Sequence, residues 1–172
     1  MRTLYLLRHA KSSWDDPGLA DHDRPLAPRG LRAVPCVAEH LRAEGIVPDV
    51  VLCSSARRTR ETLDLLGDAI PSGCDVRVED ELYDANADEL LERLHALPDS
   101  VHRAMVIGHN PATQQLALWL AASGERVDQM ARKFPTAALA TLDASIATWP
   151  DLAPGSAQLT GFVRPKDLDA PR

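Results

Sequence analysis

Residues 3–9, Thr3-Leu4-Tyr5-Leu6-Leu7-Arg8-His9, form an apolar run that is followed directly by an arginine and a histidine. The run does not alternate with charged residues, which is typical of a strand buried on both faces of a parallel sheet. Arginine offers a planar fork of donors that fits a phosphoryl group, and neutral imidazole can attack phosphorus directly. The pair alone decides nothing, so its meaning depends on what the chain places beside it.

Two further apolar runs, Asp49–Cys53 and Ala104–Ile107, have the same character as the first. Helical patterns lie between the runs, and the alternation predicts an α/β fold of three layers, α/β/α, with a mostly parallel central sheet and helices on both faces. The predicted helices are Pro28–Ala43, Ala56–Gly67, Asp88–Leu97 and Ala112–Ala122, and the further strands are Val76–Val78, Ala137–Leu142 and Leu159–Val163.

Polar motifs follow directly after each of the three buried strands: Arg8-His9, then Ser54–Arg58, then Gly108–Pro111. Because the carboxyl ends of parallel strands share one edge of the sheet, where ligands bind in such folds, we expect these motifs to converge. Two histidines and at least two arginines would then surround one cavity. The sequence therefore predicts a site for a dianion.

The helix after the second strand carries its arginines at an unusual place. Ser54 or Ser55 is a good N-cap, which puts Arg57 and Arg58 in the first turn, where the helix dipole disfavours cations by ~0.3–1 kcal/mol. A bound phosphate would compensate, since a helix N-terminus and an arginine attract the same anion. At the third junction we expect Asn110 to cap a helix that begins at Pro111.

Size and composition exclude several classes of protein. The chain has 172 residues, of which 45% are hydrophobic. No continuous apolar stretch is long enough to span a membrane. Its net charge of -6 argues against a nucleic-acid partner, which would need a basic face. The three cysteines are odd in number and lack metal-ligand spacing, and the N-terminus lacks an export signal, so we expect a cytoplasmic protein without a metal, a cofactor or a membrane partner.

No internal repeat or linker divides the chain. We expect a single domain over residues 1–164, followed by a proline-rich tail over 165–172 that is mobile or loosely docked. The sequence makes no prediction of the oligomeric state.

The motifs together resemble the histidine phosphatase superfamily, and in particular its small phosphohistidine phosphatase branch, the SixA type. The resemblance spans most of the chain and implies a phosphoglycerate mutase-like fold. It rests on Leu7–Ser12, Arg24–Leu26, Ser54–Thr62, Gly108–Pro111 and Phe134–Leu139.

The resemblance also implies roles for individual residues. His9 is similar to the nucleophile that receives the phosphoryl group, Arg8 and Arg58 would hold its oxygens, and His109 would stabilise the added charge. Arg58 is preferred to its neighbour Arg57 because the family places its arginine four residues after the serine that ends the strand. No metal is implied.

The acid that would protonate the leaving group is open. Four acidic residues, Glu79, Asp80, Glu81 and Asp84, follow the short strand at 76–78, and Glu81 best resembles the family's position. The alternative is a solvated acidic loop without a catalytic role. If the leaving group is an imidazole, an acid matters less, because a phosphoramidate bond is already labile.

Three positions depart from the family pattern. Ala10 stands where many members have glycine, and Ser55 occupies a common proline position. Ala27 replaces a helix-capping threonine, so the first helix should start less firmly by about 1 kcal/mol. None of these changes removes a reacting group. His22 and Asp23 lie on the loop before that helix, where they could line the mouth of the site.

The function expected from this resemblance is a metal-independent phosphatase that forms a phosphohistidine intermediate and acts on phosphohistidine of a protein. One alternative is a phosphatase of a small phosphorylated metabolite. A second is a non-catalytic module that binds phosphate, although the retained His9 and His109 argue against it. A nucleotide-binding domain is disfavoured because neither glycine-rich phosphate loop is present.

Overall fold

A computed structural model of the protein describes residues 1–168. Within them, seven strands form one sheet in the order β3-β2-β4-β1-β6-β7-β5. Neighbouring strands are parallel from β3 to β1, and β6 is antiparallel to both β1 and β7. The strands are β1 (Arg2–Arg8), β2 (Val50–Ser54), β3 (Asp75–Glu79), β4 (Arg103–Gly108), β5 (Ala121–Ser123), β6 (Leu139–Ala144) and β7 (Ala157–Val163).

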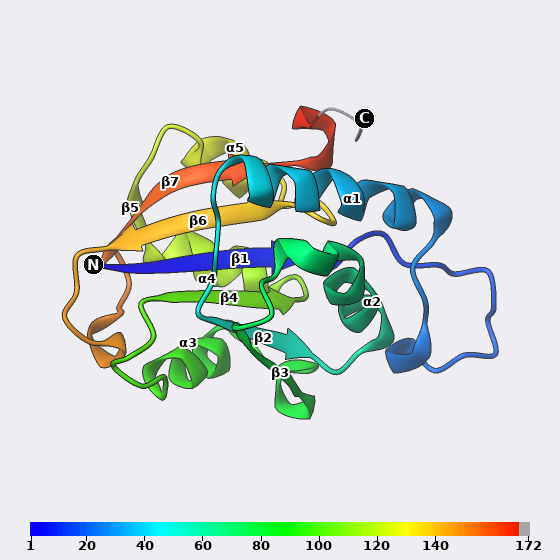
Figure 1. Ribbon diagram of the computed structural model, residues 1–172, viewed down its shortest axis with the longest axis horizontal. Coiled ribbons are helices and arrows are strands. Elements are labelled where there is room, and N and C mark those ends of the chain that lie inside the picture. The colour runs from blue at the N-terminus through cyan, green and yellow to red at the C-terminus, as the bar shows by residue number, and fades with distance from the viewer. Residues whose placement is uncertain (169–172) are drawn as a thin grey trace.

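Helices cover both faces of the sheet, with α1 and α2 in front of it in Figure 1 and α4 behind it. The α-helices are α1 (Pro28–Ala43), α2 (Arg57–Leu66), α3 (Ala87–His95), α4 (Ala112–Leu120) and α5 (Val127–Arg132). Short 3-10 turns connect some of the elements: η1 (Asp21–Asp23), η2 (Gly67–Ala69), η3 (Asp80–Leu82), η4 (Trp149–Asp151) and η5 (Pro165–Asp167). The predicted three-layer α/β/α architecture is confirmed.

Alternate residues of β1 feed two separate cores. Leu6 shares one core with Leu116 of α4, whereas Leu7 shares the other with Val34 of α1. All four side chains are fully buried, and each such side chain contributes about 1.5–3 kcal/mol by leaving water. Burial on both faces explains why the strand reads as a continuous apolar run.

The second half of the chain differs from the sequence prediction in two places. The helix predicted over 112–122 ends at Leu120, because Ala121 pairs with Ala157 of β7 and begins β5. Sheet pairing here overrides the helical preference of alanine. Helix α5 was not predicted, since its six residues are too few to show a period.

The helix caps near the predicted site also differ. Ala56, rather than a serine, is the N-cap of α2, and Ser54 Oγ accepts a hydrogen bond from the Ala56 N–H at 3.3 Å. Pro111 is the N-cap of α4, while Asn110 Oδ1 accepts from the Gln114 N–H one turn later at 3.2 Å. Helix α2 therefore starts one or two residues later, and α4 one residue later, than the caps expected from the sequence imply.

Part of the predicted tail forms a defined turn. The Asp167 carboxylate accepts hydrogen bonds from the backbone N–H of Arg164 at 3.0 Å and from its guanidinium at 2.8 Å. Leu168 packs against the core that contains α1. The rest of the predicted tail, 169–172, lies outside the described residues. None of the helices within 1–168 is both long and apolar enough to cross a bilayer.

The strands that end at the predicted motifs are direct neighbours. Arg8 pairs in register with Gly108, and Cys53 with Ile107, so β1, β4 and β2 end side by side. The arrowheads of β2 and β4 in Figure 1 point to the same side. This edge brings together residues that are about fifty positions apart in the sequence.

Candidate active site

His9 follows β1 directly and is 7% exposed. Its Nδ1 lies 2.7 Å from the carbonyl oxygen of Ala10. A carbonyl oxygen only accepts, so Nδ1 carries the hydrogen, and the neutral ring keeps its lone pair on Nε2. Burial, assisted by the charges of His109 and Arg58, lowers the pKa of His9 to about 3. The ring is therefore neutral at physiological pH, with a fixed tautomer and the lone pair on Nε2.

Two arginines, Arg8 at the end of β1 and Arg58 in the helix after β2, place their charges near the His9 ring. Arg8 donates from Nη1 to the carbonyl oxygen of Phe134 at 2.9 Å. Arg58, in the first turn of α2, donates from Nη1 to the carbonyl oxygen of Asp21 at 2.9 Å and is 7% exposed. Burial and the neighbouring Arg58 charge lower the pKa of Arg8. Two positive charges near enough for one to lower the pKa of the other favour the binding of an anion between them.

Both guanidinium groups keep a buried donor without a partner. Among residues 1–168, the Nε atoms of Arg8 and Arg58 are the buried side-chain polar atoms that lack a hydrogen bond. An unsatisfied buried donor costs about 1–3 kcal/mol, and more for a charged group. An oxyanion with several acceptor oxygens would satisfy donors of this kind.

His109 follows β4 and lies beside His9, with 5.3 Å between the ring centroids. Arg58 Nη2 lies 3.3 Å from His109 Nδ1, and because a guanidinium only donates, Nδ1 accepts. The hydrogen is then on Nε2, which donates to Ser54 Oγ at 2.7 Å. Burial and the charge of Arg58 lower the pKa of His109 to about 4. A bound dianion would raise that pKa again.

The two adjacent arginines of α2 have different surroundings. Arg58 is buried and reaches His109, whereas Arg57 is exposed and lies 3.5 Å from Glu61 on the helix surface. The structure thus brings Arg58, and not Arg57, together with the two histidines.

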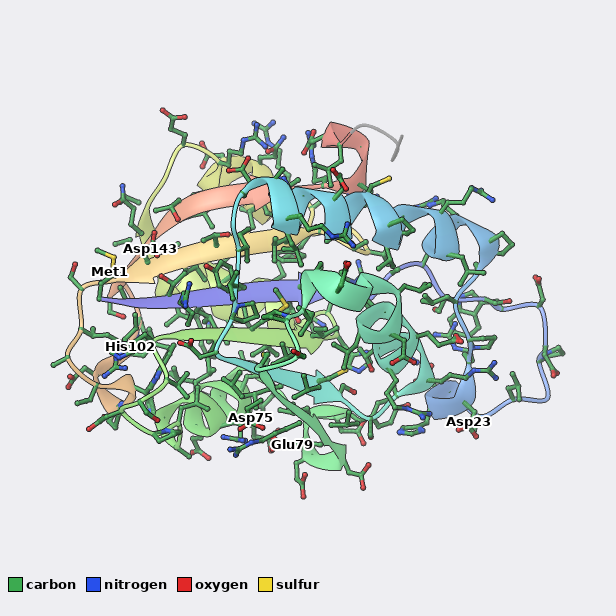
Figure 2. All side chains as sticks on the ribbon, viewed as in Figure 1. Met1, Asp23, Asp75, Glu79, His102 and Asp143 are labelled. Carbon is green, nitrogen blue, oxygen red and sulfur yellow. The ribbon has the colours of Figure 1, made fainter. Side chains whose placement is uncertain are left out.

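The acidic candidates differ in their positions relative to this cluster. Glu79 forms an ion pair with Arg93 at 2.7 Å, and Figure 2 shows it by β3. Glu81 lies exposed in η3, and its side chain makes no hydrogen bond or ion pair with another residue in the described part of the chain. Asp84 borders a cavity of about 290 Å³ that His109 also lines. The structure does not bring Glu81 into contact with His9.

Two residues of the site were missed by the sequence analysis. Asp21, in η1, accepts from Arg58 Nη2 at 3.1 Å and from the hydroxyl of Tyr83. The Tyr83 hydrogen bond, followed by the charge of Arg58, lowers the pKa of Asp21 to about 2. Tyr83 also meets His109 edge to face at 5.6 Å. Both lie in irregular segments, so no periodicity marked them.

The loop before α1 borders the site as expected. His22 Nε2 lies 2.9 Å from Ser55 Oγ, and its ring meets Tyr83 edge to face at 4.8 Å. Asp23, labelled in Figure 2, is the last residue of η1 and is exposed. Only His22 of the two expected residues therefore contacts the site.

The hydroxyl of Thr62 ties the two arginine-bearing segments together. It accepts from the Ala10 N–H at 3.0 Å and donates to the carbonyl oxygen of Arg58 at 2.7 Å. Thr62 is 1% exposed, so this bridge is shielded from water. The bridge fixes the position of α2 relative to the loop that carries His9.

The charge in the cluster comes from side chains of the protein. Within residues 1–168, no group of three His, Cys, Asp or Glu side chains is arranged to hold a metal ion. The cluster instead combines two guanidinium groups with two neutral imidazoles, a set suited to binding a tetrahedral dianion and attacking its central atom.

Comparison with known proteins identifies the class to which this arrangement belongs. A family model described as the histidine phosphatase superfamily (branch 1) matches residues 4–145. An uncharacterized protein from Mycobacterium tuberculosis is 41% identical over 164 residues, covering 93% of this chain and 100% of that protein. One from Mycobacterium leprae is 37% identical over 166 residues, with the same coverage of each chain. The chain belongs to the histidine phosphatase superfamily.

Solved structures place it more narrowly. The structure of a candidate phosphohistidine phosphatase SixA from Nakamurella multipartitia has a TM-score of 0.83 at 34% identity, over 95% of this chain and 96% of that one. A similar protein from Agrobacterium tumefaciens has a TM-score of 0.79 at 29% identity, over 95% and 98% of the two chains. The similarity is to the SixA-type branch of the superfamily, and it supports phosphatase activity.

Proposed function

We propose that this protein is a metal-independent phosphatase that removes the phosphoryl group from phosphohistidine of a protein, by way of a phosphorylated His9. One observation carries the proposal: the Ala10 carbonyl oxygen holds Nδ1–H of His9 at 2.7 Å, so Nε2 is the free nucleophile. The low pKa of His9, about 3, keeps that lone pair available at neutral pH. The similarity to SixA-type proteins supports the choice of substrate.

In the first step, the lone pair on His9 Nε2 forms a bond to phosphorus in line with the bond that breaks. The electron pair of the breaking P–N bond returns to the substrate imidazole, which takes a proton from solvent. The guanidinium groups of Arg8 and Arg58 hold the phosphoryl oxygens, and His109 stabilises the charge that develops on them.

In the second step, water attacks the phosphorus of phosphorylated His9. The P–Nε2 bond breaks, its electron pair returns to the ring, and the proton of the water leaves with phosphate or to solvent. The neutral ring that began the cycle is thereby restored. The Ala10 hydrogen bond holds the same tautomer throughout.

Glu81 remains our candidate for an acid in reactions with alcohol leaving groups. It is exposed in η3, on the segment that leads to Tyr83. An imidazole leaving group needs little help from it. We therefore assign no acid in the reaction on phosphohistidine.

The test is to incubate the purified protein, with chelator present, with a phosphohistidine protein, a phosphoserine peptide and sugar phosphates. We expect turnover of the first substrate and a phosphoenzyme that is labile to acid and stable to alkali. His9→Ala should abolish the phosphoenzyme and lower kcat by at least about 10³-fold. His40→Ala is the matched control, because His40 lies in α1 and is not one of the residues of the candidate site.

Unchanged turnover in His9→Ala would refute the mechanism. Turnover confined to sugar phosphates would identify a small-molecule phosphatase instead. Phosphate binding without any turnover would identify a binding module.

A further inference from the structure

A large cavity with six cationic side chains adjoins the candidate active site but belongs to none of the reaction steps above. Its volume is about 640 Å³, and it lies between α1, the end of α5 and the segment after β7. We call it the basic cavity, and its cations are Lys11, Arg29, Arg132, Lys133, Arg164 and Lys166.

The concentration of positive charge is unexpected for this chain. Acidic residues outnumber basic ones by 25 to 19, yet no aspartate or glutamate of residues 1–168 is among the residues that line the basic cavity. All three lysines of the sequence, Lys11, Lys133 and Lys166, are in its wall. Like charges gathered on one surface repel one another unless an anion binds between them.

Five of these six cations lack an ion-pair partner among residues 1–168. Arg164 pairs with Asp167 at 2.8 Å. The other five form no ion pair with any residue in the described part of the chain. Their charge is therefore not neutralised by an ion pair within residues 1–168.

The basic cavity and the candidate active site share a wall. Lys11 is two residues beyond His9. On the other side, the Phe134 carbonyl oxygen accepts from Arg8, and the Ala137 N–H donates to the carbonyl oxygens of Arg8 at 3.1 Å and His9 at 3.0 Å. The residues between these two contacts, Pro135 and Thr136, line the basic cavity.

We propose that the basic cavity binds an acidic segment of the phosphorylated protein substrate and thereby directs its phosphohistidine to His9. This inference rests on the proposed function for the identity of the substrate. The cavity takes several side chains at once, and Ala33, Pro135 and Pro165 add apolar surface between the charges. Lysines are flexible point charges. They therefore fit several separate carboxylates better than they fit the rigid geometry of one phosphate.

Binding is tested with a fluorescein-labelled octaglutamate peptide, followed by fluorescence anisotropy at low and high ionic strength. Arg132→Glu/Lys166→Glu should weaken binding by about tenfold or more, and salt should weaken binding to the unaltered protein. The control, Arg42→Glu/Arg77→Glu, makes the same change in net charge at exposed arginines outside the cavity. Equal weakening in both variants would overturn the proposal, since net charge alone would explain it.

The location is tested without any activity by acylating primary amines and measuring each rate by mass spectrometry. Octaglutamate should protect Lys11, Lys133 and Lys166, while the amino group of Met1, 75% exposed, serves as the internal control. Unprotected lysines would overturn the proposal. Protection by inorganic tripolyphosphate but not by octaglutamate would overturn it too, in favour of a site for a small polyanion.

The link to catalysis is tested with two phosphohistidine peptides, one flanked by glutamates and one by serines. We expect a higher kcat/KM for the acidic peptide, lost through KM in Arg132→Glu/Lys166→Glu, with turnover of para-nitrophenyl phosphate unchanged. An equal kcat/KM for the two peptides would overturn the docking role. If neither peptide is dephosphorylated, the proposed function fails, and the anisotropy and acylation experiments still decide whether the cavity binds acidic segments.

Discussion

Asp21 and Arg58 form an ion pair in which Oδ2 lies 3.1 Å from Nη2, the same nitrogen that approaches His109. The hydrogen bond from Tyr83 and the charge of Arg58 hold the pKa of Asp21 at about 2, so the carboxylate stays charged near neutral pH. It therefore offsets part of the positive charge that would hold phosphate. The pair is half exposed on the aspartate side, which keeps its strength modest.

Asp21→Asn should tighten binding of inorganic phosphate by about threefold, because removing one partly exposed charge changes the interaction by under about 1 kcal/mol. The measurement is the inhibition constant of phosphate against para-nitrophenyl phosphate. Asp23→Asn, a neighbouring exposed carboxylate, is the control and should change nothing. Weaker phosphate binding in Asp21→Asn would mean that the carboxylate orients Arg58 rather than competing for it.

The two histidines should make stability depend on pH in a defined window. In the unfolded chain each ring gains a proton near pH 6.5, whereas burial keeps the pKa of His9 at about 3 and that of His109 at about 4 in the folded chain. The unfolded state thus binds more protons below pH 6.5, so stability falls as pH drops from about 6.5 to about 4. The Tm of the double variant His9→Asn/His109→Asn should fall less over this window.

The carboxylates with lowered pKa values act below this pH window. The pKa values of Asp21 and Asp167, both about 2, affect stability only below the pKa of an unfolded aspartate. His40→Asn is the control and should keep the slope of the unaltered protein. A double variant with an unchanged slope would contradict the assignment.

Thr62→Val should cost about 1–3 kcal/mol of unfolding free energy, because the Ala10 N–H would lose its buried acceptor. It should also lower kcat, since the bridge between Ala10 and Arg58 positions the two halves of the site. Urea unfolding and steady-state kinetics measure the two effects. Thr62→Ser keeps the hydroxyl and should restore most of both, whereas equal losses in the two variants would assign the effect to packing.

Gly30→Ala tests the close approach of α1 to the loop after His9. A Cβ at this position would lie 2.3 Å from the carbonyl oxygen of Lys11, so the backbone must move. We expect a loss of stability of about 1–3 kcal/mol together with lower activity. Gly73→Ala, where no atom lies within 4 Å of the added Cβ, is the matched control for a glycine-to-alanine change.

Arg58→Ala should lower kcat/KM by at least about 10²-fold, since the proposed mechanism uses its guanidinium to hold the phosphoryl oxygens. Arg57→Ala should stay within about threefold, because that side chain is exposed and pairs with Glu61 at the helix surface. The kinetic comparison of the two neighbours is the measurement. The reverse order would show that Arg57 turns inward when substrate binds.

Residues placed by regular structure could be predicted from the sequence. His9, the Ser54–Arg58 motif and His109 follow buried parallel strands, so the rule that such strands end at one edge was enough to bring them together. The choice of Arg58 over Arg57 came from the resemblance to the family. Asp21 and Tyr83 could not be found in this way, because they reach the site from a 3-10 turn and from the segment after another, where no pattern fixes direction.

The basic cavity could not be predicted from the sequence for a different reason. Lys11, Lys133 and Lys166 lie on three separate segments, and no spacing along the chain relates them. Their meeting depends on β6 being antiparallel to β1, which returns the segment before β6 to the edge where β1 ends. The sequence pattern predicted the strand that became β6, but it did not predict the direction of that strand in the sheet.

The parallel pairing of β1, β4 and β2 has a consequence for how the protein acquires its activity. His9, Arg58 and His109 contribute to one site only after segments about fifty residues apart have found their register. Such long-range pairing requires the closure of large loops and is slow compared with helix formation. During refolding, the chain can therefore hold most of its helices and still lack a phosphate site. Catalytic activity then reports the last stage of folding.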